Sequence, residues 1–572
     1  MRRLNIFASF IAAALIAVSC GGPQKMADNA SLVDYNVTPD PLETHGGKVA
    51  VAVNVSYPEK YFHKKAIVTA IPYLQYEGGV TELKSETLQG EQVEENNKVI
   101  SFTSGGSFSY ADEVDFTPEM MRSELYVKGK ATVKNKEADL PPIKIADGII
   151  TTPLLVSKYG KTIAFGDNFK RIVPDEYVAD IHYIINRYDV RNSELKEDDV
   201  AGMADYVKAV TENERIDLKG IEVSAYASPD GELDLNTKLS GNREGSASRF
   251  IKRDLKTAKV ELPEDEELFS MLTTPEDWDG FKKLMEESDI QDKDLILRVL
   301  SMYSDPVVRE KEIKNIAEAF EEIKVKILPK LRRSVFTVKV EKIGWSDAEL
   351  KQWVVDNMDT LVLEELLYTA SLFEDNKTKL ALYGMAWEKH PKCIRAANNV
   401  GVTKLAMKDL AGAKQAFQAA KAIKDHNIVK NNLGVIALRE GDVDAAEQLF
   451  SAASGAGDEV NQNLAAIKII QGDYDAAKSL LGASQSYNNA LVILLQGQPD
   501  KAYEMLNGLK GADHPMVDYL MAVAAARGDD KDAMLGALRA AVSKKAKLKE
   551  YASKDIEFAA YFEDEAFKGI VQ

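Results

Sequence analysis

The sequence is poor in the residues that build metal centres and disulfides. Its 572 residues include 2 cysteines and 6 histidines, and the histidines are scattered without an HxxxH or HExxH spacing. Zinc sites in proteins use cysteine and histidine at short, regular spacings. We therefore expect no metal site and no cofactor, and at most one disulfide.

Motifs of known catalytic sites are equally scarce. There is no GxSxG sequence and no P-loop, and the glycine pairs Gly46-Gly47 and Gly105-Gly106 fit turns. The 90 acidic residues supply many carboxylate pairs, but no spacing singles out a glycosidase pair. We expect a protein that is not an enzyme.

Long basic runs are also missing. The net charge is −18, and no run of five or more lysines and arginines occurs. Nucleic-acid backbones bind basic surfaces, so a nucleic-acid partner is excluded. The overall composition, 45% hydrophobic and 28% charged, is typical of folded domains. The length of the chain predicts several such domains.

The N-terminus has the features of a secretory signal. Arg2-Arg3 precedes an apolar run at 6–18 that ends near Cys20, and the run is shorter than the roughly 20 apolar residues that span a bilayer. Residues 1–19 resemble a bacterial lipoprotein signal peptide, which implies cleavage before Cys20 and a palmitate-bearing lipid anchor there. Cys393 then has no disulfide partner, and we expect it to be a small core residue.

The residues after Cys20 bear on localisation. Gly21 follows the cysteine without a nearby acidic cluster. By the sorting rules of such lipoproteins, this implies an outer-membrane position facing the periplasm, with the cell surface as the alternative. We expect residues 20–36, which are mostly small and polar, to be a tether.

Residues 37–150 have the pattern of an all-β domain. Lys48–Tyr57 alternates strictly, with Val49, Val51, Val53 and Val55 on one face. Four more short strands follow, separated by glycine, asparagine and acidic turns, which predicts a β-sandwich.

Residues 159–345 predict an α+β domain. Strands at 179–185 and 332–340 flank a helix at 197–211 and the stretch 221–250. That stretch combines a strand, a Pro-Asp-Gly turn and a helix. We expect Ile221, Val223 and Ala225 on the buried face of the strand, and the buried side of the helix is expected to carry Leu235, Leu239, Ala247 and Phe250. Residues 261–329 predict a helical insertion.

This middle region resembles the OmpA-like (OmpA/MotB C-terminal type) domain, and its insertion is similar to those of Bacteroidota envelope proteins. The residues at the positions of the family motif are Tyr226, Ser228, Gly231, Asn236, Leu239-Ser240 and Arg243. The resemblance implies peptidoglycan binding, in which the family holds diaminopimelate between an acid and an arginine. Here the arginine is Arg243, whereas the acid position holds Ser228, with Asp230 two residues on as a substitute.

Two hypotheses follow for this region. In the first, the chain is a lipid-anchored envelope scaffold whose OmpA-like domain contacts peptidoglycan through Arg243, Asn236 and the 226–230 turn. In the second, it is an assembly or secretion accessory lipoprotein whose OmpA-like domain does not bind peptidoglycan. The presence of Ser228 favours the second, and Arg243 with Asn236 favours the first.

Residues 346–572 have a repeating helical pattern. A turn pair recurs at 408, 441, 472, 497 and 528, and the interval from 472 to 497 is the shortest. In a second register Gly401, Ala413, Phe417 and Ala420 recur in the next repeat as Gly434, Ala446, Phe450 and Ala453. The spacing resembles tetratricopeptide repeats, which form an all-α solenoid with a concave groove.

The resemblance implies a protein partner in that groove. The first helix of each pair supplies the candidate groove residues Asn398, Lys404, Asn431 and Asn432. The whole chain is thus expected to be multidomain, with an N-terminal all-β sandwich, a central α+β domain and a C-terminal all-α solenoid.

Overall fold

The computed structural model describes residues 22–262, 267–315, 317–509 and 514–572. The signal peptide and Cys20 therefore lie outside the described residues. The described chain divides into two units, one made of residues up to 165 together with 390–572, and the other of residues 166–389. No described helix is long and apolar enough to cross a membrane.

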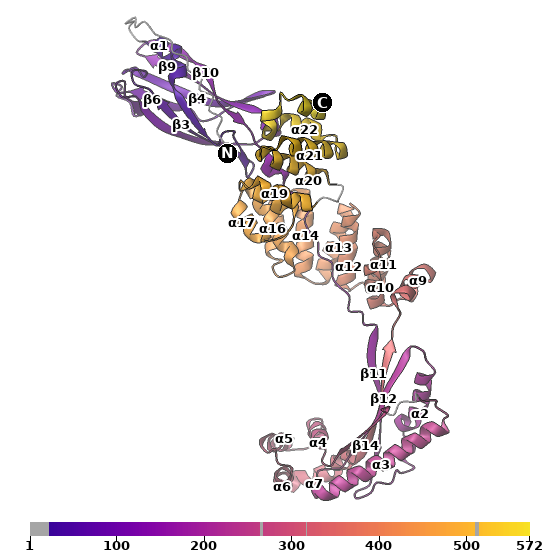
Figure 1. Ribbon diagram of the computed structural model, residues 1–572. Helices are drawn as coiled ribbons and strands as arrows, with labels where there is room; N and C mark the ends of the chain where they lie inside the picture. The colour runs from indigo at the N-terminus through magenta and orange to yellow at the C-terminus, as the bar shows by residue number, and fades with distance from the viewer. Residues whose placement is uncertain (1–21, 263–266, 316, 510–513) are drawn as a thin grey trace. The chain divides into compact units, whose positions relative to one another are not determined.

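The N-terminal part of the first unit is a sandwich of two β-sheets (Figure 1). One sheet contains β1 (Asp34–Thr38), β2 (Thr44–His45), β3 (Lys48–Tyr57) and β8 (Gly106–Asp115). The other contains β4 (Ala66–Tyr76), β5 (Gly79–Glu82), β6 (Glu86–Gly90), β7 (Lys98–Ile100), β9 (Ser123–Val133) and β10 (Lys136–Gly148). Two 3-10 turns follow β8 and β10, η2 (Pro118–Met121) and η3 (Thr152–Leu155).

Strand β3 shows why this region folds as a sandwich. Its burial alternates along the whole strand, and the four valines expected on one face are at most 4% exposed. They belong to one hydrophobic core with residues of both sheets. The period of two in the sequence therefore places one side of β3 in the core, as predicted.

Residues 20–36 were expected to be a tether, but their described part is folded. Residues 23–36 contain α1 (Pro23–Asp28), η1 (Ala30–Leu32) and the start of β1. Met26 is 2% exposed and is part of the sandwich core, and its carbonyl accepts a hydrogen bond from Tyr61 Oη at 3.1 Å. Val33 belongs to the same core and Tyr35 packs against it, so this segment is part of the sandwich although most of its residues are small and polar.

The second unit contains a four-stranded sheet in the order β11-β14-β12-β13. The strands are β11 (Ile172–His182), β12 (Ile216–Tyr226), β13 (Phe269–Thr274) and β14 (Arg333–Ile343). β14 is antiparallel to both β11 and β12, and β13 is parallel to β12. The helices α2 (Asp198–Thr211) and α3 (Leu233–Thr257), with η4 (Glu194–Lys196) before α2, complete this module.

Its core lies between the sheet and the two long helices. Ile221, Val223 and Ala225 are fully buried, as expected, and Ala247 and Phe250 of α3 pack on the same side. Leu239 is also buried, but Leu235 is 45% exposed, which corrects that prediction. Leu235 lies in the first turn of α3, beyond the end of the sheet, and lines a surface cavity there.

The insertion before β14 is not wholly helical. It contains β13, which extends the sheet at its edge, before the helices α4 to α8. These helices enclose a small core of their own, including Phe281, Met285 and Ile296. Their bounds are α4 (Trp278–Glu286), α5 (Lys293–Met302), α6 (Pro306–Lys314), α7 (Ala317–Lys326) and α8 (Leu328–Leu331).

The expected domain limits shift at both ends of this unit. Residues 159–165 belong to the first unit rather than to the middle domain, and the first helices after β14 belong to the second unit rather than to the repeats. Those elements are α9 (Asp347–Asp356), η5 (Met358–Thr360), α10 (Leu363–Ser371) and α11 (Asn376–Lys389).

From residue 394 the chain forms a solenoid of antiparallel helix pairs (Figure 1). The pairs are α12 (Ile394–Ala406) with α13 (Leu410–Ile423), α14 (Asn427–Glu440) with α15 (Val443–Ser451), α16 (Asp458–Gln471) with α17 (Tyr474–Leu481), α18 (Tyr487–Leu495) with α19 (Pro499–Gly508), and α20 (Pro515–Arg527) with α21 (Lys531–Lys544). The chain ends with α22 (Leu548–Lys554), η6 (Ile556–Tyr561) and α23 (Glu565–Val571). The C-terminal region is thus all-helical, as predicted.

The two sequence registers have separate physical causes. The turn residues at 408, 441, 472 and 497 adopt a positive φ, whereas in the fifth turn Asp529 does so and not Gly528. An aspartate caps the following helix in four of the five turns. In the second register, a Cβ on Gly401 would lie 2.5 Å from the Phe417 ring, and one on Gly434 would lie 2.6 Å from the Phe450 ring. Glycine is therefore required where the paired helices approach each other.

Candidate functional site

The first helices of the pairs hold an extended segment of the chain itself. Residues 155–165, here called the strap, connect η3 of the sandwich to the start of the second unit. The strap follows the solenoid from α18 to α12, opposite to the order of the helices in the sequence. Side chains of the solenoid bind its backbone along the whole length.

Asparagines bind alternate residues of the strap in pairs of hydrogen bonds. Asn399 Oδ1 accepts the amide of Phe165 at 2.8 Å, and Asn399 Nδ2 donates to the Phe165 carbonyl at 2.8 Å. Asn432 binds both groups of Ile163 in the same way, each at 2.8 Å. In an extended chain the N–H and C=O of one residue point to the same side, so one amide side chain can bind both.

The remaining contacts continue toward α18. Asn463 accepts the Lys161 amide at 2.6 Å and donates to the Lys161 carbonyl at 2.9 Å. Asn488 does the same for Ser157 at 2.9 and 3.1 Å. Between them, Arg439 Nε donates to the Tyr159 carbonyl at 2.7 Å, and Tyr487 Oη donates to the carbonyl of Leu155 at 3.0 Å.

The asparagines are also bonded to one another. Asn463 donates to Asn431, Asn431 to Asn432, Asn432 to Asn398 and Asn398 to Asn399, at 2.8–3.2 Å. All five are at most 1% exposed. We call Asn398, Asn399, Asn431, Asn432, Asn463 and Asn488 the asparagine ladder. Because five of its buried amides have both donor and acceptor partners, the ladder is a satisfied polar network that fixes its own orientation.

Three of the four predicted groove residues belong to the ladder. Asn398, Asn431 and Asn432 bind the chain's own backbone in this structure, at the carbonyls of Ile163 and Lys161. Lys404 does not take part in the ladder; its Nζ lies 3.9 Å from Asp409 beside the next turn. Asn399, Asn463 and Asn488 were missed, although the pair Asn398-Asn399 recurs one repeat later as Asn431-Asn432.

The second candidate site lies at the turn between β12 and α3. Arg243 is 1% exposed, and it donates from Nε to the Arg187 carbonyl at 3.0 Å and from Nη1 to the Tyr226 carbonyl at 2.8 Å. Its guanidinium carbon lies 5.0 Å from the centre of the Tyr183 ring. Burial lowers the pKa of Arg243 to about 10, so it is charged at neutral pH. Arg243 therefore organises the turn rather than extending into solvent.

The acid of this site is Asp230, and it has an ion-pair partner. Arg332 Nη2 lies 3.2 Å from Asp230 Oδ2, and Arg332 Nε donates to Ser228 Oγ at 3.2 Å. Ser228 in turn donates to Asp230. Asn236 Nδ2 donates to the carbonyls of Ser228 and Gly231 at 3.1 and 3.0 Å, which closes the turn.

These residues line a cavity of about 190 Å³. Arg243, Arg332, Asp230 and Asn236 contribute its polar part, and Leu235 and Leu239 contribute apolar side chains. Two guanidinium groups against one carboxylate leave one surplus positive charge. A carboxylate is the ligand group that such an arrangement favours. Tyr226 does not line the cavity; its ring lies 5.2 Å from the guanidinium carbon of Arg333.

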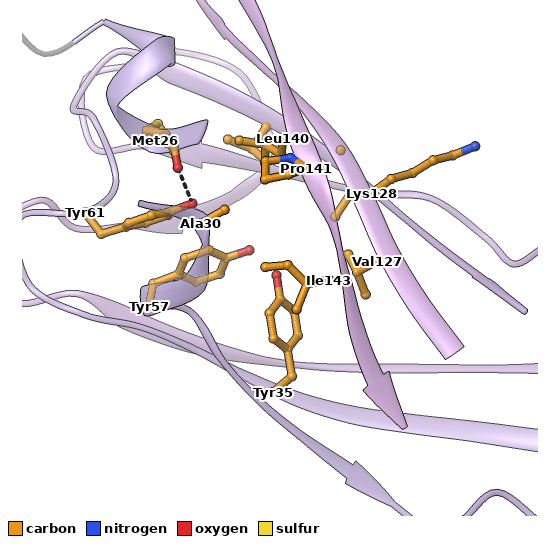
Figure 2. A pocket seen from close by; sticks show the side chains of 13 residues that line it. Met26, Ala30, Tyr35, Tyr57, Tyr61, Val127, Lys128, Leu140, Pro141 and Ile143 are labelled. Atoms are coloured by element: carbon orange, nitrogen blue, oxygen red, sulfur yellow. Dashed lines mark hydrogen bonds between the residues drawn. The ribbon is translucent and has the colours of Figure 1, made fainter. Parts of the chain in front are cut away.

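A second, smaller cavity lies in the sandwich (Figure 2). Its volume is about 20 Å³, and Tyr35, Tyr57 and Tyr61 line it beside α1. That volume accommodates about one water molecule. Burial raises the pKa of Tyr35 to about 12, so its hydroxyl is protonated at neutral pH. The cavity is therefore too small for a larger ligand.

Comparisons with known proteins add a likeness to repeat proteins. No family model matches the sequence, and no curated protein matches it. Among solved structures, a tetratricopeptide repeat protein from Parabacteroides merdae shares 14% identity over 37% of this chain and 91% of its own length, with a TM-score of 0.29.

Two further solved structures show the same kind of likeness. PilW, described as a widely conserved type IV pilus biogenesis factor, shares 17% identity over 40% of this chain and 98% of its own length, with a TM-score of 0.26. The Cut9–Hcn1 hetero-tetramer of APC/C shares 13% identity over 60% of this chain and 78% of its own length, with a TM-score of 0.31. The helix pairs and the spacing of Gly401 and Gly434 with their phenylalanine partners make the C-terminal part of this chain an all-helical solenoid that resembles tetratricopeptide repeats.

Proposed function

We propose that the chain is a non-catalytic, lipid-anchored scaffold of a bacterial cell envelope whose middle module is OmpA-like and contacts peptidoglycan. The observation that carries the proposal is the cavity at the β12–α3 turn, where Arg243 and Arg332 outnumber Asp230. The order β11-α2-β12-α3-β14, with the helices on one core, is the order that the resemblance implies.

The cavity offers complementary groups to a cell-wall stem peptide. Diaminopimelate, the residue that the OmpA-like family holds, carries a carboxylate and an ammonium group. The surplus positive charge of the arginines favours the carboxylate, and Asp230 supplies the negative partner that Ser228 lacks. Asn236 keeps the turn closed in the shape that presents both.

The second hypothesis also has a specific observation in its favour. Asp230 is already paired with Arg332, and two nitrogens of Arg243 are bonded to backbone carbonyls. Ligand binding must compete with these contacts. A module of this kind that does not bind peptidoglycan fits an accessory lipoprotein for assembly or secretion.

The anchor and the partner complete the proposal. Cys20 carries the lipid, which holds the protein at the outer membrane, facing the periplasm or, alternatively, the cell surface. The solenoid supplies the surface for a protein partner. No reaction is assigned to any of these parts.

Retention on purified sacculi tests the proposal. The full chain is compared with Arg332→Ala, which removes a cavity-lining charge, and with Arg249→Ala, a control on the exposed side of the same helix α3. We expect retention of wild type and of Arg249→Ala, and a loss of at least tenfold for Arg332→Ala. Equal retention of all three, or none for wild type, contradicts peptidoglycan binding and favours the second hypothesis.

A further inference from the structure

We propose that the concave groove of the solenoid is a receptor for an extended polypeptide, that the strap is its resident ligand in cis, and that a partner segment enters by exchange with the strap. This inference goes beyond the scaffold function and does not depend on peptidoglycan. It follows from how the groove recognises the strap, from the repetition of that recognition and from the way the strap is tethered.

Recognition is of the backbone. Among the described residues, each hydrogen bond between strap and solenoid uses a strap amide or carbonyl, at residues 155, 157, 159, 161, 163 and 165. No strap side chain takes part in these bonds. Every amino acid except proline offers the same N–H and C=O, so the ladder accepts any extended sequence that lacks proline at the bonded positions.

The recognition repeats with the solenoid. From α12 to α14 to α16, each step of one helix pair moves the contact to the next alternate strap residue, from Phe165 to Ile163 to Lys161. The step from α16 to α18 is twice as long and ends at Ser157. The strap residues of that step include Gly160 at φ +67°, and the step from α16 to α18 falls within the shortened interval between the turns at 472 and 497.

Side-chain selection is limited to a few positions. Ile163 packs against the hydrophobic cluster of α14 and its neighbours, and the Phe165 ring lies 4.9 Å from the ring of His426. Tyr159 is 66% exposed. The occupant that fits is therefore an extended segment with apolar side chains at alternate positions, in the places of Ile163 and Phe165.

The strap binds the groove more favourably than a free segment does, because both of its ends are tethered. It begins at Leu155, the last residue of η3, which is buried in the solenoid core, and it continues directly into the second unit at Gly166. A ligand tethered at both ends has an effective concentration in the mM range. A free peptide of the same sequence thus binds weakly to the native chain and more tightly once the strap is displaced.

Two substitutions displace the strap without changing the ladder. A Cβ at Gly160 would lie 2.9 Å from a methyl carbon of Val435, and the positive φ there disfavours a β-branched residue, so Gly160→Val expels the strap. Ile163→Asp is the second variant, because it places a charge in the cluster around α14. Tryptic cleavage after Lys158 and Lys161 reports whether the strap has left the groove.

The binding experiment uses a fluorescent peptide of residues 155–166 with the full-length chain. We expect at least tenfold tighter binding to Gly160→Val or Ile163→Asp than to wild type, and loss of that gain when Asn432→Ala is added. If trypsin cleaves the strap of a variant faster than that of wild type, but the peptide binds both proteins with equal affinity, the exchange is overturned. Absence of binding to both strap-released variants overturns the receptor.

N-methylated peptides separate backbone recognition from non-specific adhesion. Methyl groups on the amides of Ile163 and Phe165 remove two donors to the ladder, whereas the amides of Thr162 and Ala164 donate to no described residue. We expect the first peptide to lose binding at least tenfold and the second to keep it. Equal binding of the two peptides overturns the proposal.

Discussion

Asn463 and Asn431, from successive helix pairs, donate to the same acceptor, the carbonyl oxygen of Lys161, each at 2.9 Å. One strap residue thereby bridges α14 and α16. The strap is thus a ligand that crosses repeat boundaries, and this relationship supports the first prediction.

Asn463→Asp is expected to loosen the strap. The carboxylate can still accept a hydrogen bond from the Lys161 amide. The substitution replaces the Nδ2 donor by an oxygen, which cannot donate to the Lys161 carbonyl or to Asn431 Oδ1. Losing these bonds costs about 1–3 kcal/mol, and tryptic cleavage after Lys161 should accelerate about 5- to 100-fold. Asn461→Asp, on the exposed side of the same helix, is the matched control and should be cleaved at the wild-type rate. Equal rates for both variants would refute a role of the ladder in holding the strap.

Gly434→Ala is expected to destabilise the solenoid. The added Cβ would lie 2.6 Å from the Phe450 ring, and overpacking of this kind costs about 1–3 kcal/mol. Gly536→Ala is the control, since a Cβ there meets nothing within 4 Å and alanine is the better helix former by about 1 kcal/mol. Thermal unfolding monitored by circular dichroism measures both. A melting temperature unchanged in Gly434→Ala contradicts the close approach of α14 and α15.

Asp555 is expected to make stability depend on pH. Burial, together with the nearby charge of Glu557, raises the pKa of Asp555 to about 7, and Tyr519 Oη donates to it at 2.6 Å. Because the folded-state pKa lies above the unfolded one, the folded state holds the extra proton between about pH 4 and 7. Stability therefore falls as the pH rises through this window and is level above it.

Asp555→Asn tests that expectation, because asparagine is neutral at every pH and keeps one acceptor oxygen. The free energy of unfolding in urea, measured at pH 4.5 and 7.5, should decrease for wild type by up to about 4 kcal/mol and change much less in the variant. The same decrease in both proteins would show that another group causes it.

Cys20→Ser is expected to abolish lipid attachment. The apolar run at 6–18 followed by Cys20 predicts a lipid-bearing cysteine at the mature N-terminus. Metabolic labelling with palmitate in a bacterial host should mark wild type but not Cys20→Ser, and Cys393→Ser should be labelled like wild type. Label that persists in Cys20→Ser rules out this anchor.

The sequence revealed the features that depend on local periodicity. The spacing of Gly401 and Gly434 with Phe417 and Phe450 indicated paired helices, because each glycine faces a phenylalanine ring on the helix that follows it. The strap could not be predicted this way. Its residues bind partners 234 to 332 positions distant in the chain, and its own sequence has no periodic pattern.

The groove residues could be predicted only in part, because spacing identifies a helix face but not the segment that covers it. Asn398 and Asn431 were recognisable as repeated polar residues on first helices, whereas Lys404 shares that description and lies elsewhere. Cys393, expected in the core, is half-buried at the N-cap of α12. Spacing locates a helix face, but whether a polar side chain meets solvent or backbone depends on the segment that covers it.

Residue-resolved hydrogen exchange along the strap tests the central claim most directly. In the native chain the amides of Lys161, Ile163 and Phe165 donate to asparagine side chains, so they should exchange at least tenfold more slowly than the amides of Thr162 and Ala164. Uniformly fast exchange from 157 to 165 would contradict the account, because it would mean that the ladder does not hold the strap in solution.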